Sequence, residues 1–222
     1  MAPRTQRTER RTDALSKARI VAAAIEVLDT EGEAALTFRA LTARLATGAG
    51  AIYWHVANKD ELLAAATDAV IARAVTDGGD AEPREAVRAL ASRVFDAIDA
   101  HPWVGAQLSR EPWQAAVLEV LEGVGGQLRA LGVPAHARFD AATALVSYVL
   151  GLAGQYAAGA RLVAHTTDRP DFLAGVAARW VELDPERYPF VHEMAAQLAG
   201  HDDRAQFLAG VDLFLAGIAA LR

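Results

Sequence analysis

The segment 37–59 constrains the fold more than any other part of the sequence. The residues that favour helix starts and ends there allow only two short helices. Thr37 is a good N-cap residue for the first helix, and residues 46–48 form a short connection to the second. Asn58 can cap the helix that follows, and Glu61 stands three positions later, where its carboxylate can accept a hydrogen bond from the Asn58 backbone N–H. Two short helices joined by about three residues predict a helix-turn-helix unit.

Tyr53, Trp54 and His55 stand together at the end of the second short helix. Amphipathic rings at a helix tip suit a phosphate backbone, because one edge donates a hydrogen bond while the rest of the ring packs. The alternative is an ordinary corner between two helices, with the rings turned into the core. These three residues by themselves favour the alternative, so the decision rests on their neighbours.

The distribution of charge favours nucleic acid more than the total charge does. The net charge is −6, yet residues 1–60 carry nine Lys or Arg against seven Asp or Glu, whereas residues 61–222 carry thirteen against twenty-one. A basic arm on an acidic protein fits electrostatic contact with DNA. Any single arginine of the arm can equally well belong to a solvated, disordered tail. The two interpretations are compatible if the arm is disordered in the free protein and becomes ordered on DNA. The arginines of this arm are Arg4, Arg7, Arg10 and Arg11.

The segment from Thr37 to Leu63 resembles the DNA-binding motif of TetR-type transcriptional repressors. Its Tyr-Trp-His-Val sequence, followed by Asn-Lys, falls at the spacing of that family. One departure lies in the turn, where this chain has Ala46, Thr47 and Gly48 in place of a glycine, an apolar residue and a polar cap. Ala46 carries a steric penalty if the turn requires the left-handed conformation.

The resemblance implies how this head would contact DNA. Rings, a cap residue and a lysine would bind the phosphate backbone, while residues of the turn and the second helix would approach the bases. Small residues there offer only methyl or backbone contacts, such as an alanine against a thymine methyl. The residues implied for the backbone are Thr37, Tyr53, Trp54, His55 and Lys59, and those implied for the bases are Arg39, Thr47, Ala49 and Ala51.

Composition predicts an all-α protein. Hydrophobic residues make up 53% of the chain, alanine dominates, and runs of β-branched residues are absent. Without cysteine the chain forms no disulfide or thiolate metal site, and its polar, basic start predicts a cytoplasmic protein. We expect a flexible basic arm over 1–15, a helix-turn-helix domain with its connecting helix over 16–78, and an effector-binding and dimerisation domain over 79–222, divided near Gly78-Gly79-Asp80.

Proline residues punctuate the larger domain. Pro83 starts a helix, and His101-Pro102-Trp103 and Glu111-Pro112-Trp113 then enclose a short one. A longer helix is predicted over 113–131, whereas 168–199 is predicted to be less regular, with a helix that follows Tyr188-Pro189-Phe190 and reaches Ala199. The His-Pro-Trp step resembles the C-terminal domain of the tetracycline-repressor branch of the family.

Residues 141–160 carry no charge. Only five of them are Leu or Val, so a buried helix of a soluble protein is favoured over a membrane span. One face carries small residues, which let two helix backbones approach closely, and the last helix, over 204–221, is similarly apolar. We expect both helices to pair with a second copy around a two-fold axis rather than to be buried within one subunit. The small-residue face comprises Ala144, Ser147, Gly151, Gly154 and Ala158.

The sequence lacks the usual catalytic and metal-binding patterns. None of the six histidines pairs at the spacing of a helical metal site, and neither a glycine-rich phosphate loop nor Gly-x-Ser-x-Gly occurs, so no enzyme activity, cofactor or metal is predicted. An apolar cavity with a few polar groups is predicted instead, for a largely uncharged, planar effector. Each residue of the set can equally belong to the core, and the family resemblance favours the set as a whole: Phe95, Trp103, Gln107, Trp113, Tyr148, Gln155 and Tyr156.

Together these features predict a ligand-responsive transcriptional repressor. It would bind a palindromic DNA operator as a homodimer, without contact to a membrane, and a small apolar or aromatic effector would release it. The alternative is an all-α small-molecule-binding protein or enzyme whose head does not bind DNA, which the small residues over 46–51 allow. A structural dimerisation module would leave the ring cluster and the basic arm unexplained.

Overall fold

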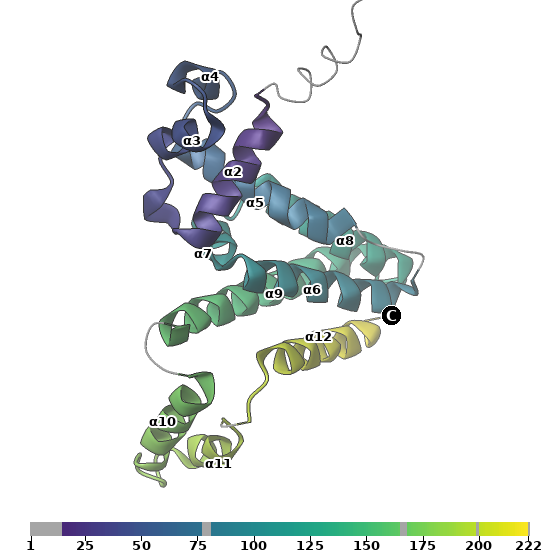
Figure 1. Ribbon diagram of the computed structural model, residues 1–222. Coiled ribbons are helices and arrows are strands. Elements are labelled where there is room, and N and C mark those ends of the chain that lie inside the picture. Colours follow the sequence, from purple (N-terminus) through teal and green to yellow (C-terminus); the bar gives the residue numbers. More distant parts are fainter. Residues whose placement is uncertain (1–14, 77–80, 165–167, 199, 222) are drawn as a thin grey trace, which may run out of the picture. The chain divides into compact units, whose positions relative to one another are not determined.

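The computed structural model describes residues 15–76, 81–164, 168–198 and 200–221, and these parts of the chain are helical without a strand (Figure 1). The all-α prediction is therefore confirmed. Two compact units divide within helix α5 (Lys59–Thr76), between Val70 and Ile71. The predicted boundary at Gly78-Gly79-Asp80, and the predicted arm up to residue 14, lie outside the described residues.

The first unit is a three-helix head joined to the first part of α5. Ser16 caps the first helix by accepting a hydrogen bond from the Arg19 N–H at 3.2 Å, and Gly32 ends the segment with a φ of +82°, which glycine adopts readily. Every helix of the head contributes aliphatic side chains to one core, including Ile20, Leu28, Leu41, Ile52 and Leu62. The elements are α2 (Lys17–Thr30), the 3-10 turn η1 (Glu33–Ala35), α3 (Phe38–Leu45) and α4 (Ala49–Tyr53).

Asn58 caps α5 as predicted, but Glu61 completes the cap differently. The Asn58 Oδ1 accepts a hydrogen bond from the Glu61 N–H at 2.8 Å. The predicted return bond to the Asn58 N–H is wrong, because the Glu61 carboxylate accepts from the Ala57 N–H at 2.8 Å and pairs with the Lys17 ammonium at 3.1 Å. The Ala57 N–H, followed by Lys17, lowers the pKa of Glu61. The same carboxylate thus ties the start of α5 to the start of α2.

The second unit is built around α9 (Ala135–Ala164), which packs against α6, α7, α8 and α12. Residues 135–159 are long and apolar enough to cross a membrane by length and composition, a property that the core helix of a soluble protein shares. The contacts of α9 with these four helices and with α10 agree with the predicted core helix. The other helices are α6 (Pro83–Ala100), α7 (Pro102–Arg110), α8 (Ala115–Ala130), α10 (Arg169–Val181), α11 (Pro189–Leu198) and α12 (Asp203–Ala219).

Some helix boundaries differ from the sequence predictions. α8 begins at Ala115 rather than at Trp113, because a turn comes first, closed by the Gln114 N–H on the Glu111 carbonyl at 3.3 Å. The segment predicted to be less regular contains the regular helix α10, whereas α11 agrees with the helix predicted after Tyr188-Pro189-Phe190. The two helices pack against each other. Asp168 caps α10, and Pro189 occupies the first position of α11, where a helix tolerates proline.

The small-residue face of α9 makes more than one kind of contact. Gly154 lies against Gly105 of α7, and a Cβ atom added to Gly105 would come within 2.9 Å of the Gly154 Cα. The prediction that Gly154 faces a second subunit is therefore wrong, since Gly154 faces Gly105, whose lack of a side chain permits the close crossing of α7 and α9 within one subunit. Ala144 instead borders an apolar groove with Leu213 and Gly217 of α12, and the Leu213 side chain is 75% exposed.

The Gly105–Gly154 crossing generates a prediction for stability. Gly105→Ala should lower the free energy of unfolding by about 1–2 kcal/mol, because overpacking of about 1–3 kcal/mol exceeds a gain in helix propensity of up to about 1 kcal/mol. Gly126→Ala is the matched control, because a Cβ there meets no atom within 4 Å, and it should raise stability by about 0.5–1 kcal/mol. Urea denaturation at one protein concentration measures both. A stabilising Gly105→Ala would show that the helices do not cross closely.

Candidate nucleic-acid interface and ligand pocket

The turn between α3 and α4 holds a strained alanine. Ala46 has φ +49° and ψ +46°, the left-handed conformation in which its Cβ crowds the backbone. The backbone N–H groups of Ala46 and Thr47 both donate to the Thr42 carbonyl, which closes the end of α3. At the other end of α3, the Thr37 Oγ1 accepts a hydrogen bond from the Ala40 N–H at 3.1 Å. The turn therefore requires the conformation for which the sequence predicted a penalty.

Helix α4 presents backbone and methyl groups rather than long side chains. It has five residues, and Gly48 precedes it without a side-chain cap. Ala49 and Ala51 are exposed, and a Cβ added at Gly50 would meet no atom within 4 Å. Ile52 is fully buried and anchors α4 to the core of the head. The open face of α4 is thus narrow and uncharged, which permits close approach to a groove of DNA.

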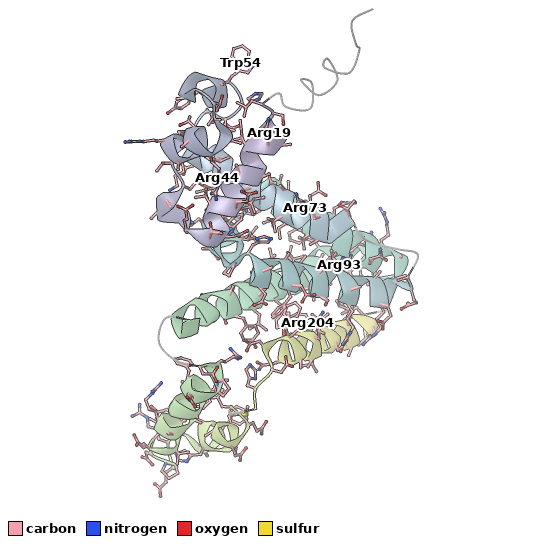
Figure 2. All side chains as sticks on the ribbon, viewed as in Figure 1. Arg19, Arg44, Trp54, Arg73, Arg93 and Arg204 are labelled. Carbon is pink, nitrogen blue, oxygen red and sulfur yellow. The ribbon has the colours of Figure 1, made fainter. Side chains whose placement is uncertain are left out.

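The ring cluster lies at the surface and not in the core. Trp54 is 87% exposed and points outward at the end of α4 (Figure 2), and Tyr53 is 53% exposed. The Tyr53 ring stacks on Phe38 at the start of α3, with ring centroids 4.5 Å apart and an interplanar angle of 25°. His55 is half-buried. Sequence reasoning missed Phe38, because nothing local indicates that the start of α3 meets the end of α4.

The cations of the head differ in how they are used. The Lys59 ammonium donates to the Glu33 carbonyl at 2.6 Å, and Arg44 pairs with Glu31 at 3.4 Å. Arg39 is exposed and forms no ion pair with any residue that the structure describes. Thr47 is half-buried in the turn. Arg4, Arg7, Arg10 and Arg11 lie outside the described residues.

A pocket of about 460 Å³ opens between α7, α8 and α9. Trp113, which is 86% exposed, lies on its wall together with Leu150 and Val117. A second pocket of about 370 Å³ lies between α7 and α9, and Gln155 is on its wall. Of the residues predicted to bind a ligand, these pockets thus include Trp113 and Gln155. Ser109, Ser147 and Leu150 also line them and were missed, because serine and leucine carry no specific sequence signal.

The remaining predicted ligand residues lie elsewhere in the second unit. Phe95, Tyr148 and Tyr156 form a ring cluster with Phe207, in which the Phe95 and Phe207 centroids are 4.7 Å apart. The Tyr148 hydroxyl donates to the Phe207 carbonyl at 3.0 Å and the Tyr156 hydroxyl bonds Gln206, so the cluster joins α9 to α12. Burial, and secondarily Asp203, raises the pKa of Tyr156 to about 12. Trp103 and Gln107 are buried on α7.

A helix-turn-helix head on a larger helical body defines a class of proteins, the DNA-binding transcriptional regulators that respond to ligands. Residues 20–66 match the family model for bacterial regulatory proteins of the tetR family, and residues 77–222 match the model for the tetracyclin repressor-like C-terminal domain. Since the second match spans more than half of the chain, the chain belongs to the TetR family. The resemblance in the sequence is confirmed.

Solved structures of similar proteins agree with this assignment. The transcriptional regulator SCO7222, a TetR from Streptomyces coelicolor, is 51% identical, with a TM-score of 0.85 over 94% of this chain and 99% of its own. BioQ bound to its natural double-stranded DNA operator is 28% identical, with a TM-score of 0.63 over 93% of this chain and 99% of its own. The Streptomyces coelicolor protein ActR in complex with actinorhodin is 25% identical, with a TM-score of 0.72 over 93% and 96%.

The left-handed Ala46 should make the turn easy to stabilise. Ala46→Gly should raise the free energy of opening that protects the α3 and α4 amides from hydrogen exchange by about 0.5–1 kcal/mol. The reason is that relief of about 1–2 kcal/mol of strain exceeds the entropic cost of about 0.4–1 kcal/mol from the flexibility that glycine adds to the unfolded chain. Ala43→Gly, exposed inside α3, should lower protection by about 1 kcal/mol. Hydrogen exchange of the α3 and α4 amides measures both, and equal losses would contradict a strained turn.

The Phe38–Tyr53 stack should act on DNA affinity through Tyr53. Phe38→Leu keeps apolar volume but removes the ring, so we expect DNA to bind about 3–10-fold more weakly, in line with the energy of a ring pair. In a Tyr53→Ala background the same substitution should change affinity little. Val27→Ala, in the core of α2, controls for general loss of stability. An undiminished effect of Phe38→Leu in the Tyr53→Ala background would refute the positioning role.

Proposed function

We propose that this protein is a repressor that binds a palindromic operator as a homodimer and leaves it when a small, largely uncharged effector fills the pocket between α7, α8 and α9. It acts by binding alone, without catalysis, in the cytoplasm where bacterial DNA lies. The observation that carries the proposal is the exposure of Tyr53 and Trp54 at the end of a five-residue helix that follows a helix-turn-helix turn. The operator-bound BioQ and the actinorhodin-bound ActR support its two halves.

The head suits DNA through phosphates and shape rather than through many base contacts. The exposed rings of Tyr53 and Trp54 and the guanidinium of Arg39 suit backbone and groove edges. Ala49 and Ala51 offer methyl groups to thymine. Lys59 supports this surface because its ammonium holds the Glu33 carbonyl of η1, and the N-terminus of α5, which begins at Lys59, favours phosphate.

A second copy fits the apolar groove between α9 and α12. The groove has a volume of about 350 Å³, and Ala144, Leu213 and Gly217 are among its lining residues. A side chain as apolar and exposed as Leu213 gains free energy when a partner covers it. Two copies related by a two-fold axis would place two α4 helices on one duplex, which requires a separation of roughly 34–36 Å or a multiple of it.

Helix α5 provides the physical link between effector and head. The last turn of α5 belongs to the same unit as the pocket, and the Arg93 Nε of α6 donates to the Ala74 carbonyl at 2.7 Å (Arg93 is labelled in Figure 2). The first turn of α5 belongs to the head, where Glu61 pairs with Lys17. A ligand shifts an equilibrium only by its differential affinity for the two states. The effector must therefore bind more tightly when α5 is in a position at which the distance between the two α4 helices no longer matches the operator.

The test uses DNA fragments that flank the gene of this protein. Fluorescence anisotropy should detect one specific fragment, with affinity falling at least about 100-fold between 50 and 200 mM salt, as several phosphate contacts require. Candidate effectors that change tryptophan fluorescence should release this fragment, and Trp113→Ala should weaken the release without changing DNA affinity. Absence of any specific fragment at low salt would overturn the regulator, and fluorescence changes that leave DNA affinity unaltered would overturn the switch.

A further inference from the structure

The two pockets beside α7 form adjoining parts of one groove. Ser109 of α7 and Gly151 of α9 line both of them. A Cβ atom added at Gly151 would meet no atom within 4 Å, so nothing at this residue divides the groove. The second pocket also includes Gly105 and Gly154, the pair at which the two helix backbones cross. A ligand longer than the first pocket can therefore extend past Gly151 toward the helix crossing.

The groove is uncharged along its whole length. None of the residues that line the two pockets, within the described parts of the chain, is acidic, basic or a histidine. Charged side chains gather instead in a separate pocket of about 360 Å³, where they pair with one another: Asp203 with Arg169 at 2.7 Å, and Asp96 with Arg204 at 2.8 Å. A charged ligand in the uncharged groove would lose hydration without gaining a partner.

The two ends of the groove differ in chemistry. The first pocket is lined mainly by apolar side chains such as Trp113, Val117 and Leu150, which suit a flat apolar body, and Thr143 and Ser147 add hydroxyl groups to its wall. In the second pocket the Ser109 hydroxyl donates to the Gly105 carbonyl at 2.9 Å, so its oxygen keeps lone pairs that can accept a hydrogen bond from a ligand. Gln155 is exposed there and can both donate and accept. Hydroxyl groups, which also donate and accept, match this end.

We propose that the effector is an elongated, uncharged, amphipathic molecule. Its planar apolar ring system lies against Trp113 in the first pocket, and a hydroxylated portion passes Gly151 to reach Ser109 and Gln155 in the second. The pocket volumes of about 460 and 370 Å³ suit a ligand with two such parts. The ligand class is defined by this groove, and only its effect on DNA rests on the proposed function.

Three probes with one ring system test the proposal on the full chain: 1-hydroxyanthraquinone, its O-glucoside and anthraquinone-2-sulfonate. Tryptophan fluorescence titration should show the glucoside binding about tenfold more tightly than the parent, the gain expected from one or two hydrogen bonds. The sulfonate should bind at least about tenfold more weakly than the parent, because its charge has no partner in the groove. Equal affinities for parent and glucoside, or tightest binding of the sulfonate, would overturn the proposal.

Variants separate the two ends of the groove. Gln155→Leu alters a residue that lines only the second pocket, so it should remove most of the advantage of the glucoside and leave the parent unchanged, whereas Trp113→Ala should weaken both. Gly151→Val, which narrows the junction, should weaken the glucoside more than the parent, with sedimentation confirming an unchanged oligomeric state. A Gln155→Leu variant that weakens parent and glucoside equally would contradict the two-part groove.

Operator release is measured with the same probes and separates the two proposals. If the probes bind with the expected order of affinities but none releases the operator, the proposed switch is contradicted and the proposed ligand class is supported. If parent and glucoside bind the protein with equal affinity and release the operator at equal concentrations, the proposed ligand class is contradicted and the proposed switch is supported.

Discussion

The backbone contact between Gly105 of α7 and Gly154 of α9 is the constraint on which the ligand groove depends. Because neither residue has a side chain, the helices approach until a Cβ at Gly105 would lie 2.9 Å from the facing Cα. Both glycines line the second pocket, which continues into the first through Ser109 and Gly151. The absence of a side chain at Gly105 thus allows the two helices to cross closely at one end of the groove.

In the head, the short helix α4 is stabilised by contacts with neighbouring elements. A five-residue helix has too few backbone hydrogen bonds to be stable by itself. α4 persists because Ile52 is buried beneath it and because Tyr53 stacks on Phe38. Several cations of the head, such as Lys17 and Arg44, are paired internally. Within the described residues, the surface proposed for DNA combines rings, methyl groups and backbone with the exposed Arg39 guanidinium, which favours recognition by shape and phosphate contact.

Helix α5 connects the head to the second unit, because each of its ends makes contacts within a different unit. At its start the Asn58 cap and the Lys17–Glu61 pair hold it to the head. At its end Arg93 holds the Ala74 carbonyl. Its continuous backbone hydrogen bonds make it stiff, so a change at one end is carried to the other rather than absorbed between them. The proposed regulation of the head by the groove therefore needs no contact between ligand and DNA-binding residues.

Local sequence is enough to predict the features that depend on neighbours a few residues away. The caps at Thr37 and Asn58, the penalty on Ala46 and the proline starts of α6 and α7 all act within one helical turn, so local chemistry predicts them. Tertiary structure decided every partner that is distant in sequence. Examples are the Glu33 carbonyl for Lys59, the Phe38 ring for Tyr53, and Gly105 for Gly154. It also divided the predicted ligand set between the groove, which has Trp113 and Gln155, and a core cluster around Phe207. Periodicity places a residue on a helix face, but only the packing of helices decides whether that face meets a core, a cavity or solvent.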